Sequence, residues 1–184
     1  MADGDSGPRP GDSGSYQSGD SDSYQEVVVV SDRQQDLLVA QDRWAELLRR
    51  VLAEERIVAP WEAGLSFVAA DEMAALNAAH RGIDRPTDVL AFGADDGSAP
   101  RAGDEPRLVG DVVICPSVAA SNAEAHGRTV DDELALLVVH GALHLLGYDH
   151  LDDNDAQIME QREQELLARA SAADALAGSR AGSR

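Results

Sequence analysis

The sequence is poor in residues that several kinds of function require. Its 184 residues contain a single cysteine, Cys115, so no disulfide can form within the chain. All 15 basic side chains are arginine, and lysine is absent. The 34 acidic side chains give a formal net charge of −19. This charge argues against a nucleic-acid scaffold that binds by overall positive charge, although a few local arginines can still hold phosphates.

Long apolar runs are also missing. No stretch reaches the ~18 consecutive apolar residues of a membrane span, and the first 25 residues lack the apolar core of a signal peptide. Together with the single thiol, this predicts a cytoplasmic protein without a membrane partner. Cys115 ends the apolar run 112–114, which favours a buried thiol over a catalytic one.

The composition divides the chain into one domain and two tails. Residues 1–24 consist mainly of Gly, Ser, Asp and Pro, which predicts a disordered N-terminal tail. An interaction tail is the alternative. Residues 171–184 consist of Ala, Gly, Ser, Arg, Leu and Asp, and we expect a second disordered tail there. The remaining segment, 25–170, is long enough for one domain with its own core.

Apolar periodicity predicts a single α+β domain with a small mixed sheet of about four strands and about five helices. One of these helices is very apolar and therefore buried. The sequence has several strands close enough for antiparallel pairing. The expected strands are 26–30, 65–69, 87–92 and 108–115, and the expected helices are 41–55, 72–80, 116–126, 131–146 and 153–169.

Three local signals refine these elements. Asp71 is a candidate N-cap for the second helix, and Thr129-Val130-Asp131-Asp132 resembles a capping box before the most apolar helix. Residues 93–106 are rich in Gly, Asp, Ala and Pro, which predicts a long mobile loop.

The most apolar helix carries two histidines. His140 and His144 are four residues apart, so their imidazoles stand one turn above each other on one helix face. Gly147 can take the left-handed conformation that ends a helix and reverses the chain, which would bring back His150. Three histidine ligands leave a fourth tetrahedral position open, as in catalytic zinc sites. Three separately satisfied histidines and a structural zinc are the alternatives.

The same three-histidine spacing occurs in metzincin proteases. Those enzymes need a glutamate directly after the first histidine as general base, whereas Gly141 occupies this position. A glycine cannot accept a proton, so the pattern disfavours that kind of protease.

Three segments together resemble one family. Residues 140–150 (HGALHLLGYDH) resemble the signature of the YbeY family, bacterial zinc endoribonucleases linked to ribosomal RNA maturation. Residues 76–81 (LNAAHR) with 86–92 (PTDVLAF), and residues 110–114 (GDVVI), are similar to two further family segments. The resemblance covers residues 26–168.

The chain departs from the family pattern at three positions. Ala91 stands where the family usually has Ser, Gly93 where it usually has Pro, and His80 where it often has Tyr. These departures concern the local loop rather than the three histidines. We expect His80 to be a surface or rim residue rather than a fourth ligand.

The resemblance implies hydrolysis of phosphodiester bonds in single-stranded RNA, with one zinc ion per chain. Arg81 matches the family's functional arginine, which implies a catalytic and substrate-binding role, and Arg85 is a second candidate phosphate contact. Candidates for the general base are Asp88, Asp111 and Asp149, unless no separate base is needed. The attacking group is left open between water and the 2′-hydroxyl of the RNA.

The resemblance also implies partners. These are ribosomal RNA and, beyond it, small-subunit ribosomal proteins or GTPases; DNA is not expected. Two rival functions are a metal hydrolase that acts on another bond, such as a peptide, and a ribosome-maturation binding factor whose zinc is mainly structural.

Overall fold

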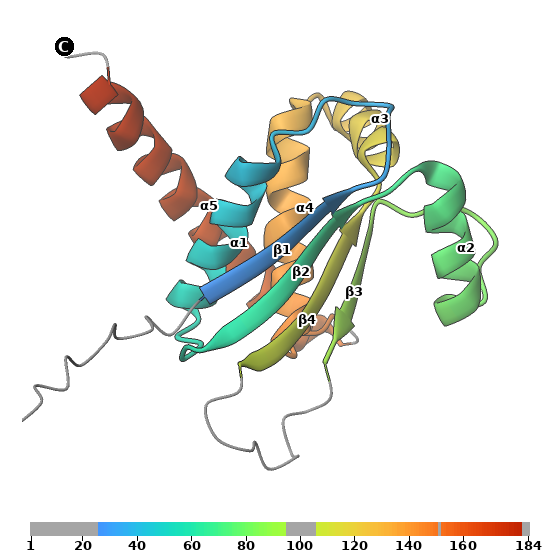
Figure 1. The fold of residues 1–184 in the computed structure, drawn as a ribbon, viewed down its shortest axis with the longest axis horizontal. Coiled ribbons are helices and arrows are strands. Elements are labelled where there is room, and N and C mark those ends of the chain that lie inside the picture. Colours follow the sequence, from blue (N-terminus) through green and yellow to red (C-terminus); the bar gives the residue numbers. More distant parts are fainter. Residues whose placement is uncertain (1–25, 95–105, 151, 182–184) are drawn as a thin grey trace, which may run out of the picture.

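A computed structural model of the chain describes residues 26–94, 106–150 and 152–181. It confirms the predicted class, an α+β domain with a four-stranded mixed sheet and five helices (Figure 1). The elements in chain order are β1 (Glu26–Asp32), α1 (Gln41–Glu54), β2 (Trp61–Phe67), α2 (Ala70–Arg81), β3 (Val89–Gly93), β4 (Arg107–Ile114), α3 (Pro116–His126), α4 (Val130–Leu145) and α5 (Asp153–Ala181).

The strands lie in the order β1-β2-β4-β3. β1 pairs with β2, and β2 with β4, in parallel, so that Leu65 lies opposite both Val30 and Val112. Only β3 pairs antiparallel, with Leu90 opposite Val113 of β4. The expectation of antiparallel pairing was therefore right for this pair alone. Between β1 and β2 the helix α1 returns the chain to its starting end, and such a crossover makes neighbouring strands parallel.

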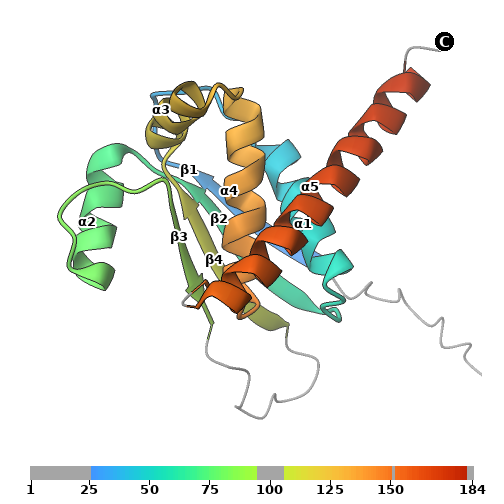
Figure 2. The same cartoon turned by 180° about the vertical axis from the view of Figure 1, so that it is seen from behind.

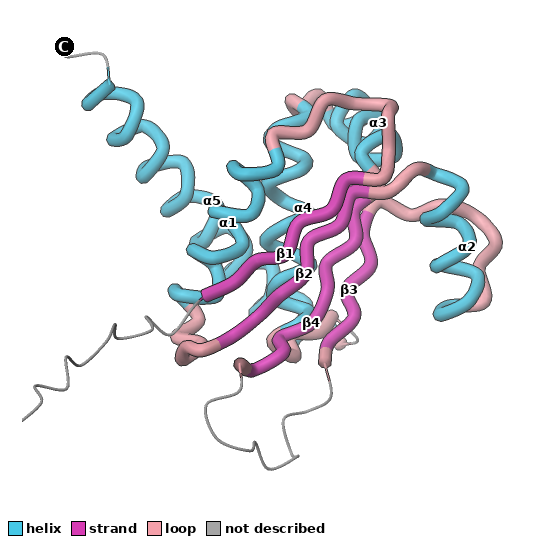
Figure 3. Tube along the Cα trace, viewed as in Figure 1, coloured by secondary structure: helices cyan, strands magenta, loops and turns pink. Residues whose placement is uncertain are grey.

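One face of the sheet is covered by helices. Side chains alternate along β2, where Trp61, Leu65 and Phe67 are completely buried while Glu62 and Ser66 between them are half-buried. Helices α1, α4 and α5 lie on the same side of the sheet, as the views from the front and from behind agree (Figures 1 and 2). α2 stands beside the edge strand β3, away from these helices (Figure 3). The core is thus a sheet packed under a helical layer.

α4 is the central helix of this layer. Thr129 caps it, because its side-chain oxygen accepts a hydrogen bond from the backbone N–H of Asp132 at 3.1 Å, as the sequence predicted. Acidic residues in its first turn interact favourably with the helix dipole. Gly141 faces Val112 of β4, and a Cβ atom there would lie 2.6 Å from Cγ1 of that valine. The missing side chain lets α4 approach the sheet closely.

Three local predictions differ from the structure. β2 begins at Trp61 and ends at Phe67, whereas the expected strand covered residues 65–69. The N-cap of α2 is Ala69, and Asp71 lies inside the first turn. α5 continues to Ala181, whereas a loose tail was expected from residue 171 onward. The alanines in this segment have the highest helix propensity of all residues, which supports the longer helix. The predicted tail 1–24 and most of the predicted loop 93–106 lie outside the described residues. No helix in the described part of the chain is both long and apolar enough to cross a membrane.

Candidate metal centre

Three histidine rings lie together at the C-terminal end of α4. The ring centroids of His140 and His144 are 4.6 Å apart, and the ring of His150 lies 5.0 Å from His144 and 5.9 Å from His140. The first two rings are partly buried and the third is exposed. The convergence expected from the four-residue spacing and the following glycine is therefore present in the fold.

The turn after α4 brings the third histidine back. Gly147 has φ +88°, a left-handed conformation that glycine adopts without strain. The backbone N–H of Tyr148 then donates to the carbonyl of Leu143 at 3.1 Å, which folds the chain against the last helical turn. This reversal places Asp149 and His150 beside His144.

The hydrogen bonds of two rings determine which nitrogen atoms carry protons. Nδ1 of His140 lies 3.0 Å from a carboxylate oxygen of Glu163, and Nδ1 of His144 lies 3.0 Å from the backbone carbonyl oxygen of Tyr148. Both partners accept, so each Nδ1 donates its proton there and the Nε2 atom of each ring points toward the other ring. The two Nε2 atoms lie 3.1 Å apart. This is close to the nitrogen spacing of about 3.4 Å at a tetrahedral zinc with Zn–N bonds of about 2.0–2.1 Å.

At this distance the two Nε2 atoms either share one proton or both direct a lone pair at a metal ion. Their spacing and the engaged Nδ1 atoms therefore fit a bound metal ion. A carboxylate lies at the same place. Asp149, His144 and His150 offer potential ligand atoms that all lie within 4.8 Å of one another. This tightest group leaves out His140, which joins the centre through His144. The described geometry thus offers four potential donor side chains for one ion.

The protonation of His144 agrees with a ligand role. Its pKa is lowered from the usual value, mainly because burial disfavours the charged ring and also because His140 and His150 are close. The hydrogen bond to Tyr148 and the carboxylate of Asp149 oppose this effect only in part. A ring that stays neutral keeps its lone pair available for a metal ion.

Of the three aspartates that sequence reasoning left open, one lies at the histidines. Asp149 accepts a hydrogen bond from the backbone N–H of His150 at 2.7 Å. Asp88 is fully engaged elsewhere, because its two oxygens accept from Thr87, from the backbone N–H of Val89 and from Asn122. A carboxylate used in this way holds a turn together.

The third aspartate, Asp111, points to the opposite face of the sheet. Its neighbour Val112 contacts Gly141 of α4, and successive strand side chains alternate between faces. The carboxylate of Asp111 instead covers Gly64 of β2, where a Cβ atom would lie 1.8 Å from its Oδ1. The fold therefore separates Asp111 from the histidines.

Neither predicted substrate-binding arginine is among the hydrogen-bond or ion-pair partners of the three histidines in the described part of the chain. Arg81 is the last residue of α2, Arg85 lies in the following turn, and both are exposed. The ion pairs found among the described residues do not include them. α2 and α4 end toward the same end of the sheet with β3 between them (Figures 1 and 2). His80 packs its ring against Phe92 of β3, with centroids 4.6 Å apart, rather than against the other histidines.

Sequence reasoning missed two groups that hold the rings. Glu163 lies 23 residues after His140, on a different helix, and no spacing rule connects them. The acceptor for His144 is the backbone carbonyl of Tyr148, a group that every residue type possesses. Only the packing of α5 against α4 and the path of the turn reveal these contacts.

Comparisons with known proteins agree with the motif. Residues 29–171 match the protein family described as Endoribonuclease YbeY. A relative of that name from Desulforamulus reducens is 38% identical over 147 residues, which cover 78% of this chain and 96% of the relative. The one from Salinispora tropica is 47% identical over 114 residues, covering 58% and 73%.

A solved structure is similar as well. The solution structure of TM1509 from Thermotoga maritima matches with a TM-score of 0.53 and 26% sequence identity. The match covers 78% of this chain and 89% of that protein. The motif, the fold and these relatives lead to one conclusion: the chain belongs to the endoribonuclease YbeY family.

Proposed function

We propose that the protein is a zinc-dependent endoribonuclease that cuts single-stranded ribosomal RNA during its maturation, in the cytoplasm. The observation that carries this proposal is the convergence of His140 and His144, whose Nε2 atoms face each other 3.1 Å apart while both Nδ1 atoms are engaged elsewhere. The name of the family supplies the RNA substrate. In this proposal His140, His144 and His150 hold one zinc ion per chain.

Each residue near the centre then has a distinct task. Zinc held by the three rings would polarise a phosphoryl oxygen and lower the pKa of an attacking water. Glu163 and the carbonyl of Tyr148 keep both Nδ1 protons in place and so orient the rings. Asp149 is the acceptor for the proton of the attacking group, because it alone of the three candidate aspartates lies beside the histidines.

Arg81 has a binding task at the substrate. Its exposed guanidinium carries no carboxylate partner among the described residues, so it is free to hold a phosphate through two parallel hydrogen bonds. Arg85 adds a second, weaker phosphate contact. Since neither lies against the histidines, we propose that they hold the RNA strand on the far side of β3 while another phosphate occupies the metal centre.

A peptide hydrolase of the metzincin kind is disfavoured by packing as well as by chemistry. Gly141 faces Val112 so closely that even a Cβ atom would lie 2.6 Å from a methyl carbon. A glutamate at this position cannot be added without moving α4 away from the sheet.

The decisive test is cleavage of a labelled single-stranded fragment of ribosomal RNA by the purified protein. The protein is assayed as purified, after removal of metal by a chelator and after reloading with zinc. His144→Ala is the inactive variant, and His126→Ala is its matched control, because His126 is exposed at the end of α3 and its ring contacts the backbone carbonyl of Asn122, in the same helix. Zinc-dependent cleavage lost only in His144→Ala supports the proposal.

Two results would contradict it. Equal cleavage by the His144→Ala variant would assign the activity to a contaminating nuclease. Absence of cleavage by zinc-loaded protein would favour a ribosome-maturation binding factor, whose zinc is structural.

A further inference from the structure

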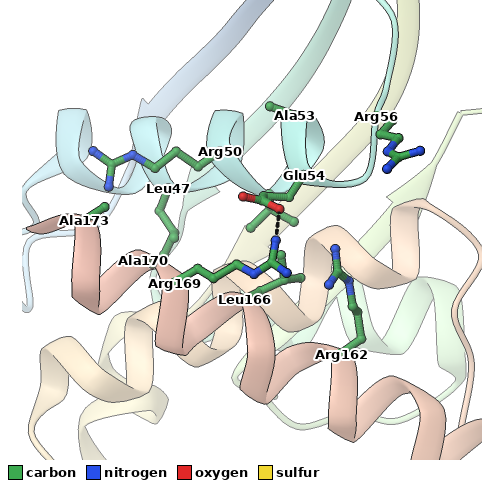
Figure 4. A pocket seen from close by; sticks show the side chains of 11 residues that line it. Leu47, Arg50, Ala53, Glu54, Arg56, Arg162, Leu166, Arg169, Ala170 and Ala173 are labelled. Carbon is green, nitrogen blue, oxygen red and sulfur yellow. Dashed lines mark hydrogen bonds and ion pairs between the residues drawn. The ribbon is translucent and has the colours of Figure 1, made fainter.

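A groove of about 650 Å³ lies between α1 and α5, and four arginines are among the residues that line it. Figure 4 shows Arg162 and Arg169 reaching from α5 toward α1, and the ion pair between Arg169 and Glu54. A second ion pair joins the same two helices one residue further along α1, where Nε of Arg162 donates to Glu55 at 2.6 Å. The two pairs connect the same elements, so they can be compared directly.

The Arg162–Glu55 pair is much more buried than its neighbour. The side chains of Arg162 and Glu55 are 21% and 12% exposed, against 57% and 40% for Arg169 and Glu54. Burying two charges costs desolvation free energy that their attraction only partly offsets. Glu55 also follows the last residue of α1, where the negative end of the helix dipole disfavours a carboxylate. Stability alone therefore gives little reason for a glutamate at this position.

The second oxygen of Glu55 connects the pair to the metal centre. It accepts a hydrogen bond from the Tyr148 hydroxyl at 3.1 Å. The carbonyl of the same tyrosine is the acceptor for Nδ1 of His144. The tyrosine is therefore held at its side-chain end by Glu55 while its backbone orients a histidine ring.

The other end of the ion pair reaches the second ring. Arg162 is followed by Glu163, whose carboxylate is the acceptor for Nδ1 of His140 at 3.0 Å. Fixing Arg162 against Glu55 fixes the turn of α5 that carries Glu163. The Arg162–Glu55 ion pair is thus connected to both groups that accept from the rings, the carbonyl of Tyr148 and the carboxylate of Glu163.

We propose that Glu55 is a positioning residue of the metal centre: held by Arg162, it orients His144 through Tyr148 and His140 through the adjoining Glu163. The inference rests on the proposed zinc site. Outer contacts of this kind fix the tautomer and the direction of ligating rings, and their loss typically weakens metal binding about 10–100-fold.

The test compares three variants of the full-length protein in the absence of RNA. Tyr148→Phe removes only the hydroxyl. Glu55→Gln keeps the length of the side chain but removes its negative charge, so the contact with Arg162 is no longer a charge-assisted hydrogen bond. Glu54→Gln is the matched control, because it breaks the neighbouring pair between the same helices. Zinc affinity is measured by competition with a coloured chelator, the visible spectrum of Co²⁺-loaded protein reports ligand geometry, and the unfolding temperature is taken without metal.

We expect Glu55→Gln and Tyr148→Phe to weaken zinc binding about 10–100-fold and to alter the Co²⁺ spectrum. The Glu54→Gln variant should stay within about twofold of the native affinity, with a native spectrum. Glu55→Gln and Tyr148→Phe interrupt the same series of contacts. The double variant should therefore bind zinc with about the same affinity as the single variant that binds it more weakly.

Several results would overturn the inference. It fails if Tyr148→Phe and Glu55→Gln both bind zinc within about twofold of the native affinity. The proposed zinc site would be unaffected by that result. It also fails if Glu54→Gln weakens binding as much as Glu55→Gln, since packing of α5 would then explain the effect. If Glu55→Gln does not fold, Tyr148→Phe alone decides. Native protein that binds no zinc would remove the proposed metal centre together with this inference.

Discussion

The Nε2 atoms of His140 and His144 face each other across 3.1 Å, because an acceptor at each Nδ1 holds the ring in that direction. Glu163 provides one acceptor and the carbonyl of Tyr148 the other. Without a metal, one proton can be shared between the two Nε2 atoms. A bound metal ion would use the same arrangement as two ligands of one site.

Replacing one of these rings should remove the metal. We expect the native protein to retain one zinc ion per chain after gel filtration, and His144→Ala to retain none, because His144 is the ring that joins His140 to His150 and Asp149. His126→Ala should retain the native content. Elemental analysis of the eluted protein measures this. Full zinc content in the His144→Ala variant would rule out the three-histidine centre.

Replacing Arg81 should separate binding of metal from turnover of RNA. Arg81→Ala should keep its zinc and lower kcat/KM by about 10²–10³-fold, the usual cost of losing one charge-stabilising donor. Arg81→Lys should be intermediate, because an ammonium cannot make the two parallel hydrogen bonds of a guanidinium. Arg49→Ala, on α1, is the control. Unchanged turnover in Arg81→Ala would take Arg81 out of the mechanism.

Gly141 should be needed for packing. In Gly141→Ala the new methyl group meets Val112 at 2.6 Å, a stiff β-branched side chain, so we expect a loss of about 1–3 kcal/mol in the free energy of unfolding. Gly93→Ala is the matched control, because the nearest atom to a Cβ there is 4.0 Å away. Urea unfolding of both variants without metal measures the difference. Equal stability of the two would show that α4 can move freely against β4.

Acid should destabilise the metal-free protein through His144. Its pKa in the folded state is lowered by burial and by the two neighbouring rings, so the unfolded chain takes up the proton first as the pH falls. This contribution to stability is present above the unfolded pKa of about 6.5 and is lost as the pH falls through the folded pKa. The unfolding temperature should therefore drop more steeply below pH 6.5 in the native protein than in His144→Asn. Parallel curves would show that His144 titrates normally.

Several features could be predicted from sequence because they depend on short-range geometry. The four-residue spacing of His140 and His144 puts two rings on one helix face whatever surrounds the helix. The left-handed turn at Gly147 and the cap at Thr129 follow from the conformational preferences of those residues. For the same reason most of the expected strands and helices lie close to the observed ones, although β2 begins four residues earlier and α5 ends twelve residues later than expected.

Pairing between distant segments could not be predicted in this way. β4 lies between β2 and β3, so the parallel pairing of β2 with β4 depends on the whole path of the chain. The sequence offers no reason to prefer Asp88, Asp111 or Asp149 as the general base. The fold distinguishes them: Asp88 hydrogen-bonds within a turn, Asp111 lies on the opposite face of the sheet, and Asp149 lies beside the histidines.

The sequence by itself determined the family, the helix that carries two histidines and the turn that returns the third. Tertiary structure alone decided which groups contact these rings and their neighbours. Glu163 contacts His140, and the Glu55–Arg162 pair is connected to His144 through Tyr148. Tertiary structure also decided that α2, which ends at Arg81, stands beside β3 and away from α4. The physical reason is the separation along the chain of the residues involved. Helix faces and glycine turns are properties of a few adjacent residues, whereas ring orientation depends on helices brought together by burial of a common core.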